Sequence, residues 1–159
     1  MPVSGRWWIV RRYLVVANQT LGGEELCGAI RERIAGGDCH FHLLVPATPA
    51  AQLGPGVTAE VAAGGEPGED LGRRLARQRM RHELDRMREL GASVSGEIGV
   101  ADPVDAVRVV LHRWEFDEVI LSTLPGRRSR WLAADLPTKI RRGFKLQVTQ
   151  VTGATAARG

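Results

Sequence analysis

The segment "EVILST", from Glu118 to Thr123, is a short run of apolar and β-branched residues that leads into a turn at Pro125–Gly126. A run without polar alternation predicts a strand that is buried on both faces. A second run of the same kind, "RYLVVA" from Arg12 to Ala17, ends at the turn former Asn18. Strands of this type belong to parallel sheets that helices cover on both sides, so the two segments predict an α/β fold.

The rest of the chain alternates strands with helices. Three further strands are predicted at His40–Val45, Ala92–Ile98 and Lys145–Val151. Four helices are predicted: one that carries Leu26, Ile30 and Ile34 and stops at Gly36–Gly37, one over Leu71–Leu90, one begun by "ADPVDAV", and one over Leu136–Arg142. This alternation predicts a single Rossmann-like domain, an open parallel sheet of five strands with helices on both faces.

Two of these helices carry more detailed expectations. In "ADPVDAV", Asp102 can cap the helix, Pro103 suits its first position, and Asp105 adds charge near the positive end of the dipole. The predicted buried side of that helix consists of Val104, Val107, Val110, Leu111 and Trp114. The helix over Leu71–Leu90 has a predicted apolar stripe of Leu71, Leu75, Met80, Leu84 and Met87, and an arginine-rich face interleaved with Glu83, Asp85 and Glu89.

Length, composition and charge bound the class of protein. With 159 residues, 43% of them hydrophobic, the chain has the size of one domain with a sizeable core. No apolar run approaches the roughly 20 residues that a membrane span needs, and "MPVSGRWWIVRRYLVV" does not have the form of a secretory signal, so we expect a cytoplasmic protein. Cys27 and Cys39 are then expected to be free thiols. The net charge of +4 is almost all arginine and does not by itself indicate a partner.

The order of elements, together with three short motifs, resembles a universal stress protein domain. The motifs are "YLVVAN" at the end of the first strand, "GVADPVDAV" before the third helix and "FDEVILST" in the fourth strand. The resemblance covers residues 12–151, leaving 1–11 as an amino-terminal extension and 152–159 as a tail, with one long loop at 47–69. It implies an adenine nucleotide alpha hydrolase-like fold with strand order 3-2-1-4-5 and a ligand site at the switch point between strands one and four.

The loop after the fourth strand departs from the Gly-x2-Gly-x9-Gly-Ser/Thr pattern of the family members that bind ATP. Ser122–Thr123 stands where the first glycine is expected, Gly126 is retained, and Ala134–Asp135 replaces the final Gly-Ser/Thr. Glycine lets backbone amides approach phosphate closely, and a carboxylate at Asp135 repels phosphate, so we expect ATP to bind poorly. The aspartate that ends the family's first strand is replaced by Asn18, which can hydrogen-bond but is uncharged.

Segments rich in hydrogen-bond donors nevertheless flank the predicted switch point. Arg127, Arg128 and Arg130 lie around Ser129, and guanidinium groups bind phosphate bidentately. Across the crevice, Asn18 precedes a helix whose free amides favour an anion. The candidate ligand-binding residues are Asn18, Thr20, Gly22, Val45, Ser122, Thr123, Gly126, Arg127, Arg128, Ser129 and Arg130. The alternative is that the arginines are solvated loop charges.

Two functions from different classes fit these observations. The first is a binding module for a nucleotide or another small ligand that carries phosphate. The second is an interaction module that keeps the fold, has lost the ligand and works through a partner. The resemblance implies a homodimer through the fifth strand, and Leu146–Val151 suits this because an edge strand without proline or charge can pair with its copy. Alternatively, the tail Thr152–Gly159 or the Trp7–Trp8 segment covers this edge.

Other candidate sites are weaker. His40 and His42 share one face of a strand, but no third ligand has suitable spacing and the flanking residues indicate core, so no metal is predicted. The interleaved acids of the arginine-rich helix are typical of a solvated face, so nucleic acid and membrane surfaces are not expected partners. The sequence contains no nucleophile elbow, no Walker loop and no nucleophile paired with histidine, so no enzymatic activity is predicted.

Overall fold

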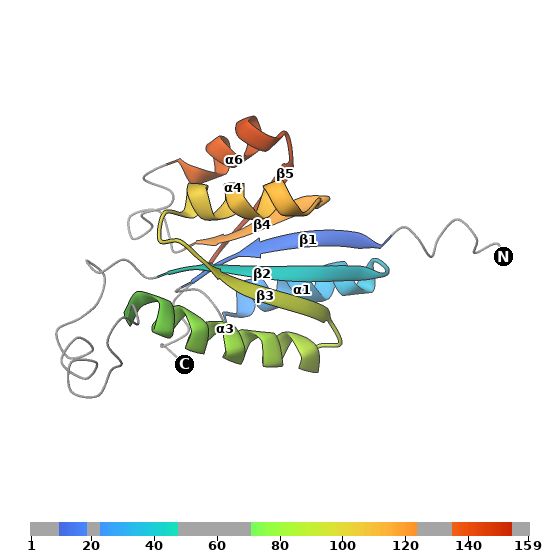
Figure 1. Cartoon of the computed structure of the whole chain (residues 1–159). Helices are drawn as coiled ribbons and strands as arrows, with labels where there is room; N and C mark the ends of the chain where they lie inside the picture. Colours follow the sequence, from blue (N-terminus) through green and yellow to red (C-terminus); the bar gives the residue numbers. More distant parts are fainter. Residues whose placement is uncertain (1–9, 19–22, 48–70, 124–134, 154–159) are drawn as a thin grey trace.

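The chain folds into one parallel sheet between two layers of helices (Figure 1). The computed structural model describes residues 10–18, 23–47, 71–123 and 135–153. The strands are β1 (Arg11–Val16), β2 (Cys39–Pro46), β3 (Ser93–Gly99), β4 (Glu118–Thr123) and β5 (Gln147–Thr152). The helices are α1 (Glu24–Ala35), α3 (Leu71–Glu89), α4 (Pro103–Arg113) and α6 (Leu136–Phe144). None of these four helices combines the length and apolar character that crossing a bilayer requires.

The strand order is β3-β2-β1-β4-β5, and all neighbouring strands pair in parallel. Val15 of β1 lies at the centre, opposite Leu43 of β2 on one side and Ile120 of β4 on the other. The fold class and the strand order predicted from the sequence are therefore confirmed. The strands β3 and β5 form the two edges of the sheet.

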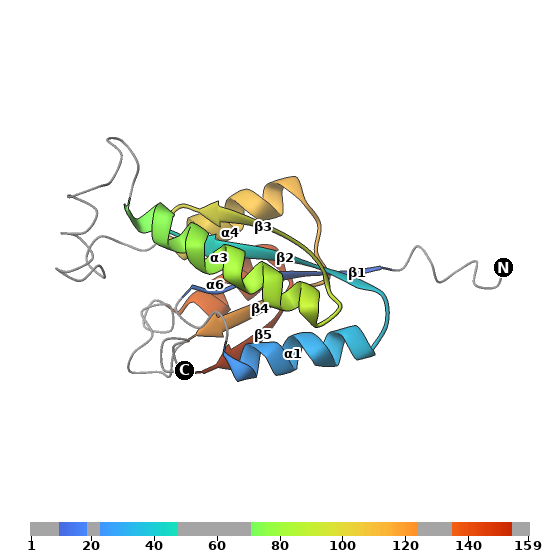
Figure 2. The ribbon, with the colours of Figure 1, turned by 90° about the horizontal axis from the view of Figure 1, so that it is seen from below.

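Side chains that alternate along the strands build two separate cores. On one face, Tyr13, Val15 and Ala17 pack toward α1 and α3, which lie across that face in Figure 2. On the other face, Leu14 and Val16 pack toward α4 and α6. All residues of β4 are buried. Burial on both faces explains why this strand reads as a continuous apolar run in the sequence.

The start of α4 is built as its sequence predicts. The carboxylate of Asp102 accepts a hydrogen bond from the backbone N–H of Val104 at 3.0 Å, and Pro103 is the first helical residue. Close packing of this helix depends on Gly99 at the end of β3, because a Cβ there would lie 2.7 Å from the Cβ of Ala106. The helix is thus fixed at its first turn against the sheet.

Two side chains lie elsewhere than the sequence predicted. Trp114 was assigned to the buried side of α4 but is 46% exposed, with the guanidinium of Arg12 over its ring. It follows the last helical residue in extended conformation, so helical periodicity no longer applies to it. Glu83 was assigned to the solvated face of α3 but is 3% exposed. It lies seven residues after the buried Ala76 and next to Leu84, so the helix turns it into the apolar stripe.

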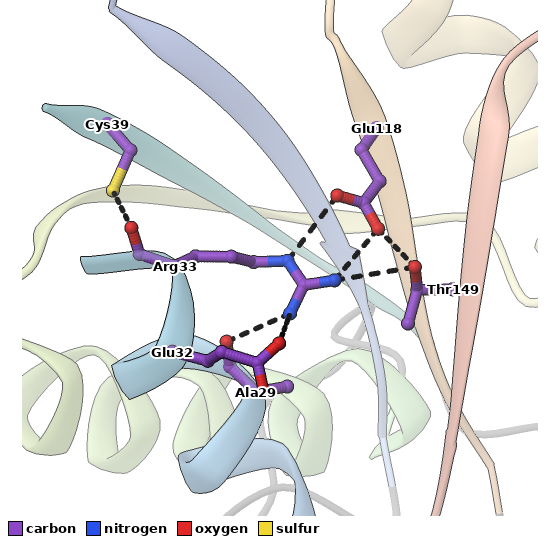
Figure 3. A network of polar contacts seen from close by, with 6 residues as sticks. All are labelled: Ala29, Glu32, Arg33, Cys39, Glu118 and Thr149. Carbon is purple, nitrogen blue, oxygen red and sulfur yellow. Dashed lines mark hydrogen bonds and ion pairs between the residues drawn. The ribbon is translucent and has the colours of Figure 1, made fainter. Parts of the chain in front are cut away.

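A buried ion pair connects α1 with β4 and β5 (Figure 3). The Nη2 group of Arg33 donates to Glu118 Oε2 at 2.8 Å and to the Thr149 hydroxyl at 3.3 Å. The Thr149 hydroxyl in turn donates to the same carboxylate. The Arg33 and Glu118 side chains are only 13% and 8% exposed. The pair closes the amino end of the sheet, away from the ends where a ligand of such folds binds.

Candidate functional site

The switch point lies between β1 and β4. The two strands are neighbours in the sheet, but the chain leaves β1 for α1 on one face and leaves β4 for α6 on the other. Ligands of open α/β sheets bind outside the carboxyl ends of the strands at such a point. Because Val16 pairs with Leu121, the residues that follow both strands are brought together.

Buried polar side chains are concentrated at this place. Among the described residues, the buried polar or charged side chains are Asn18, Glu83, Glu118, Ser122 and Thr123. Three of these, Asn18, Ser122 and Thr123, lie at the carboxyl ends of β1 and β4, where the sequence predicted ligand contacts. Burying polar groups costs free energy unless they are hydrogen-bonded, so a cluster of them at the end of an apolar sheet points to a site.

Asn18 is held in a fixed orientation. Its Nδ2 group donates to the carbonyl oxygen of Pro46, the last residue of β2, at 2.8 Å. This bond turns the amide oxygen of Asn18 away from β2 and settles which end of the amide accepts hydrogen bonds. Val45, one residue earlier in β2, is fully buried in the core on the α1 and α3 face.

Thr123 links the end of β4 to β5. Its carbonyl oxygen accepts a hydrogen bond from Gly153 N at 3.0 Å, and its hydroxyl accepts one from Gln150 Nε2 at 3.5 Å. Ser122 and Thr123 are each 2% exposed. Their side chains point to opposite faces of the sheet, as those of successive strand residues do. Together they end β4 with hydroxyl groups where the ATP-binding pattern of the resembled family has a glycine, and this end of β4 is called the floor of the switch point.

Arg79 of α3 is part of this site, although the sequence did not single it out. Its Nη1 group donates to Oδ1 of Asn18. Burial lowers the pKa of Arg79 from its ordinary value, because a partly desolvated charge is less stable than a solvated one. The sequence does indicate that Arg79 faces the sheet, since Arg79 stands three residues after Ala76 and four before Glu83, and residues at this spacing share one face of a helix.

The helix starts around the carboxyl edge of the sheet carry acids. Glu24 and Glu25 lie in the first turn of α1, and Asp135 precedes α6. Asp135 adopts the left-handed conformation, with φ of 57°, and its side chain makes no capping hydrogen bond. Carboxylates at helix N-termini stabilise the helix dipole. The same positions would otherwise favour an external anion, so these acids oppose phosphate there.

Several predicted site residues lie outside the described residues. These are Thr20, Gly22, Gly126, Arg127, Arg128, Ser129 and Arg130. The arginine-rich loop therefore remains a prediction from the sequence.

His40 and His42 belong to a polar ladder rather than to the apolar core that their flanking residues indicated. The Ser95 hydroxyl lies 2.9 Å from His40 Nε2 and 2.7 Å from His42 Nδ1. His42 Nε2 contacts Glu97 at 2.6 Å, and Glu97 also accepts from Arg113 at 2.5 Å. In the described part of the chain, no group of three or more histidine, cysteine, aspartate or glutamate residues is arranged to hold a metal ion.

A cavity of about 460 Å³ lies at the other end of the sheet. Its lining includes Arg11, Tyr13, Arg33 and Asp38. The guanidinium of Arg33 is already engaged by Glu118, Thr149 and the carbonyl of Ala29, so it has little capacity to bind a ligand. The switch point is the better candidate site.

Fold and site together define a doubly wound α/β domain with a polar switch point. No protein-family model matches the sequence, and no curated protein matches it significantly. Solved structures do match in three dimensions. A universal stress protein in complex with cAMP superposes with a TM-score of 0.60 at 16% identity, over 91% of this chain and 98% of that chain.

Two further structures show the same likeness. A universal stress protein family protein from Arabidopsis thaliana with AMP bound has a TM-score of 0.52 at 12% identity, over 93% of this chain and 94% of that one. A deacetylase of the teicoplanin biosynthesis pathway has a TM-score of 0.59 at 10% identity, over 92% of this chain and 68% of the deacetylase. The chain therefore has the fold of the universal stress proteins.

Proposed function

We propose that the chain is a divergent member of the universal stress protein family and binds a nucleotide, or another small ligand with phosphate, at the switch point. The observation that carries this proposal is the cluster of buried polar side chains at the ends of β1 and β4. Asn18 and Arg79 supply one side of the site, and Ser122 and Thr123 supply its floor. Folds of this kind with cAMP and AMP bound support a nucleotide as the ligand.

The loop after β4 completes this proposal. Arg127, Arg128 and Arg130 follow the floor residues closely in sequence. Guanidinium forks can bind phosphate where glycine-rich backbone would otherwise do so. We propose binding and not catalysis, because the sequence lacks the usual catalytic motifs, although a deacetylase shares the fold.

A thermal-shift and calorimetry panel tests the proposal. AMP, cAMP, ATP, adenosine and inorganic phosphate are each added at millimolar concentration. A ligand at 100 times its Kd stabilises the fold by about 2.7 kcal/mol. In a domain of this size that corresponds to a rise in Tm of roughly 5–10 °C. No rise in Tm with any nucleotide would contradict the proposal.

Two variants with the same substitution at opposite ends of the sheet test where the nucleotide binds. Ser122→Ala removes a hydroxyl from the floor of the switch point, and Ser93→Ala makes the same change at the start of β3, at the amino end of the sheet. We expect the first variant to weaken nucleotide binding and the second to leave it unchanged. Equal effects of both variants would argue against the switch point as the site.

A second candidate function is a dimeric interaction module. The outer edge of β5 favours it, because Gln147–Thr152 contains neither proline nor charge. Such an edge leaves backbone donors and acceptors available to a second copy of the chain. A protein that dimerises and binds none of the nucleotides would support this candidate over the first.

A further inference from the structure

The charges at the carboxyl edge of the sheet are arranged with the cation inside and the acids outside. Arg79 is half-buried and bonded to the amide of Asn18. Glu24, Glu25 and Asp135 are exposed at the starts of α1 and α6. A ligand that binds here meets one guanidinium in depth and carboxylates at the rim.

The position of Arg79 is determined by a chain of hydrogen bonds. Pro46 O holds the Asn18 amide through Nδ2, and the Asn18 amide oxygen accepts from Nη1 of Arg79. Arginine has five N–H donors. Within the described residues, Asn18 is the hydrogen-bond partner of Arg79, so most of its donors have no acceptor there. A guanidinium oriented in this way can offer a pair of its remaining donors to an anion.

Desolvation makes an anion favourable at this position. Taking a cation out of water costs free energy, and an anion placed beside it offsets that cost. Burial already lowers the pKa of Arg79, which reports this cost. Glu83, one helical turn further along α3, is also buried, and an ionised carboxyl group there would oppose additional negative charge. One compact anionic group fits this balance better than several.

The rim disfavours a long chain of phosphates. Phosphates usually lie at helix N-termini, where backbone N–H groups point at them. At the start of α1 this place carries two glutamates, and at the start of α6 it carries Asp135. A chain of phosphates that reached the start of either helix would meet these carboxylates and be repelled.

We propose that Arg79 is the anion-recognising residue of the switch point and that the site prefers a nucleoside with a single phosphate group over a triphosphate. This inference rests on the proposed nucleotide binding at the same site. Asn18 acts as a positioning residue, because it holds the guanidinium and is itself held by β2. Asn18 stands where an aspartate is expected at the end of the first strand, and Arg79 is bonded to it. Together the two residues place a positive charge where the expected aspartate would place a negative one.

The test compares adenosine, AMP and ATP by calorimetry on the wild-type chain and on Arg79→Met. Wild type is expected to bind AMP at least tenfold more tightly than adenosine, and more tightly than ATP. In Arg79→Met the preference for AMP over adenosine should disappear, while adenosine affinity stays within about twofold. The control is Arg81→Met, because Arg81 is an exposed arginine on the same helix, and it should behave as wild type.

Two further variants keep the test informative if Arg79→Met does not fold. Arg79→Lys keeps the charge but loses the fork, and should show a reduced preference for AMP. The triple variant Glu24→Gln, Glu25→Gln, Asp135→Asn removes the rim charges and should raise ATP affinity while AMP affinity changes little. The triple variant leaves the buried core unchanged, since all three of its residues are exposed.

The outcomes separate this inference from the proposed function. If wild type binds AMP and Arg79→Met keeps the full preference over adenosine, the role of Arg79 is wrong and nucleotide binding stands. If wild type binds ATP more tightly than AMP, the single-phosphate preference is wrong. If wild type binds none of the three, the proposed function fails and the inference fails with it.

Discussion

The variant Arg33→Met removes the cation of the buried ion pair. The Glu118 side chain, which is 8% exposed in the intact protein, then keeps the Thr149 hydroxyl as its remaining partner in the network. In the intact protein this carboxylate accepts from Nη2 at 2.8 Å and from Nε at 3.4 Å. Two unit charges about 4 Å apart at an effective dielectric constant of 20 attract each other by about 4 kcal/mol. Breaking such a pair on one side costs about 3–5 kcal/mol, so we expect a loss of that size in the free energy of unfolding.

The reverse variant should cost less. Glu118→Leu leaves a guanidinium that still donates to the carbonyl of Ala29 at 3.0 Å and lies 3.9 Å from the exposed carboxylate of Glu32. The double variant Arg33→Met, Glu118→Leu removes both charges and should recover most of the stability, because apolar replacements of a buried pair are often neutral or stabilising. The two single losses are therefore expected not to add.

The assay is urea unfolding followed by circular dichroism at pH 7. Arg108→Met is the control, since it breaks an ion pair between Arg108 and Asp105 in which both side chains are 53% exposed. Its loss of unfolding free energy should be less than about 1 kcal/mol. A loss of unfolding free energy below about 1 kcal/mol for Arg33→Met would show that the buried pair does not contribute as expected. A double variant whose loss equals the sum of the two single losses would show that the two charges are not coupled.

Two further predictions concern acid stability and assembly. Burial, with the charges of Arg12 and His42, lowers the pKa of His40, and although burial acts to raise the pKa of Glu97, hydrogen bonds from His42 and Arg113 outweigh it and lower that pKa. Because the folded pKa values lie below the ordinary 6.5 and 4.5, the stability that they contribute is present above those values and is lost as the pH falls below them. Urea midpoints should therefore decrease from pH 7 to pH 4, with a smaller decrease above pH 5 in His40→Gln. A flat pH profile contradicts this. For assembly, we propose that the chain forms a dimer through β5. The double variant Gln147→Lys, Gln150→Lys should sediment as a monomer, because both glutamines are exposed and lysine blocks edge pairing. A wild-type chain that is monomeric at high micromolar concentration would contradict this proposal.

The fold could be predicted because its signals are local. The β4 segment is buried on both faces and reads as an unbroken apolar run, and Asp102–Pro103 begins a helix by its own hydrogen bonding. Alternation of such signals leaves few topologies. The positions of Asn18, Ser122 and Thr123 followed from the topology, because parallel strands bring their carboxyl ends to one edge.

The parts that could not be predicted depend on contacts between distant segments. The Arg79–Asn18 bond joins residues 61 apart, and in the sequence Arg79 is one of many arginines in α3. The ion pair of Arg33 with Glu118 spans 85 residues. The ladder of His40 and Ser95 requires the β2–β3 register, which apolar patterns alone do not specify for a half-buried edge strand.

A nucleotide site at the switch point is tested most directly by a titration of the isotopically labelled chain with AMP, followed by amide chemical shifts in NMR spectra. Such a site predicts saturable shifts for Ala17, Asn18, Ser122 and Thr123 at the carboxyl ends of β1 and β4. It predicts little change for Ser93, at the amino end of β3. Shifts confined to the amino end of the sheet, or none at millimolar AMP, would contradict a nucleotide site at the switch point.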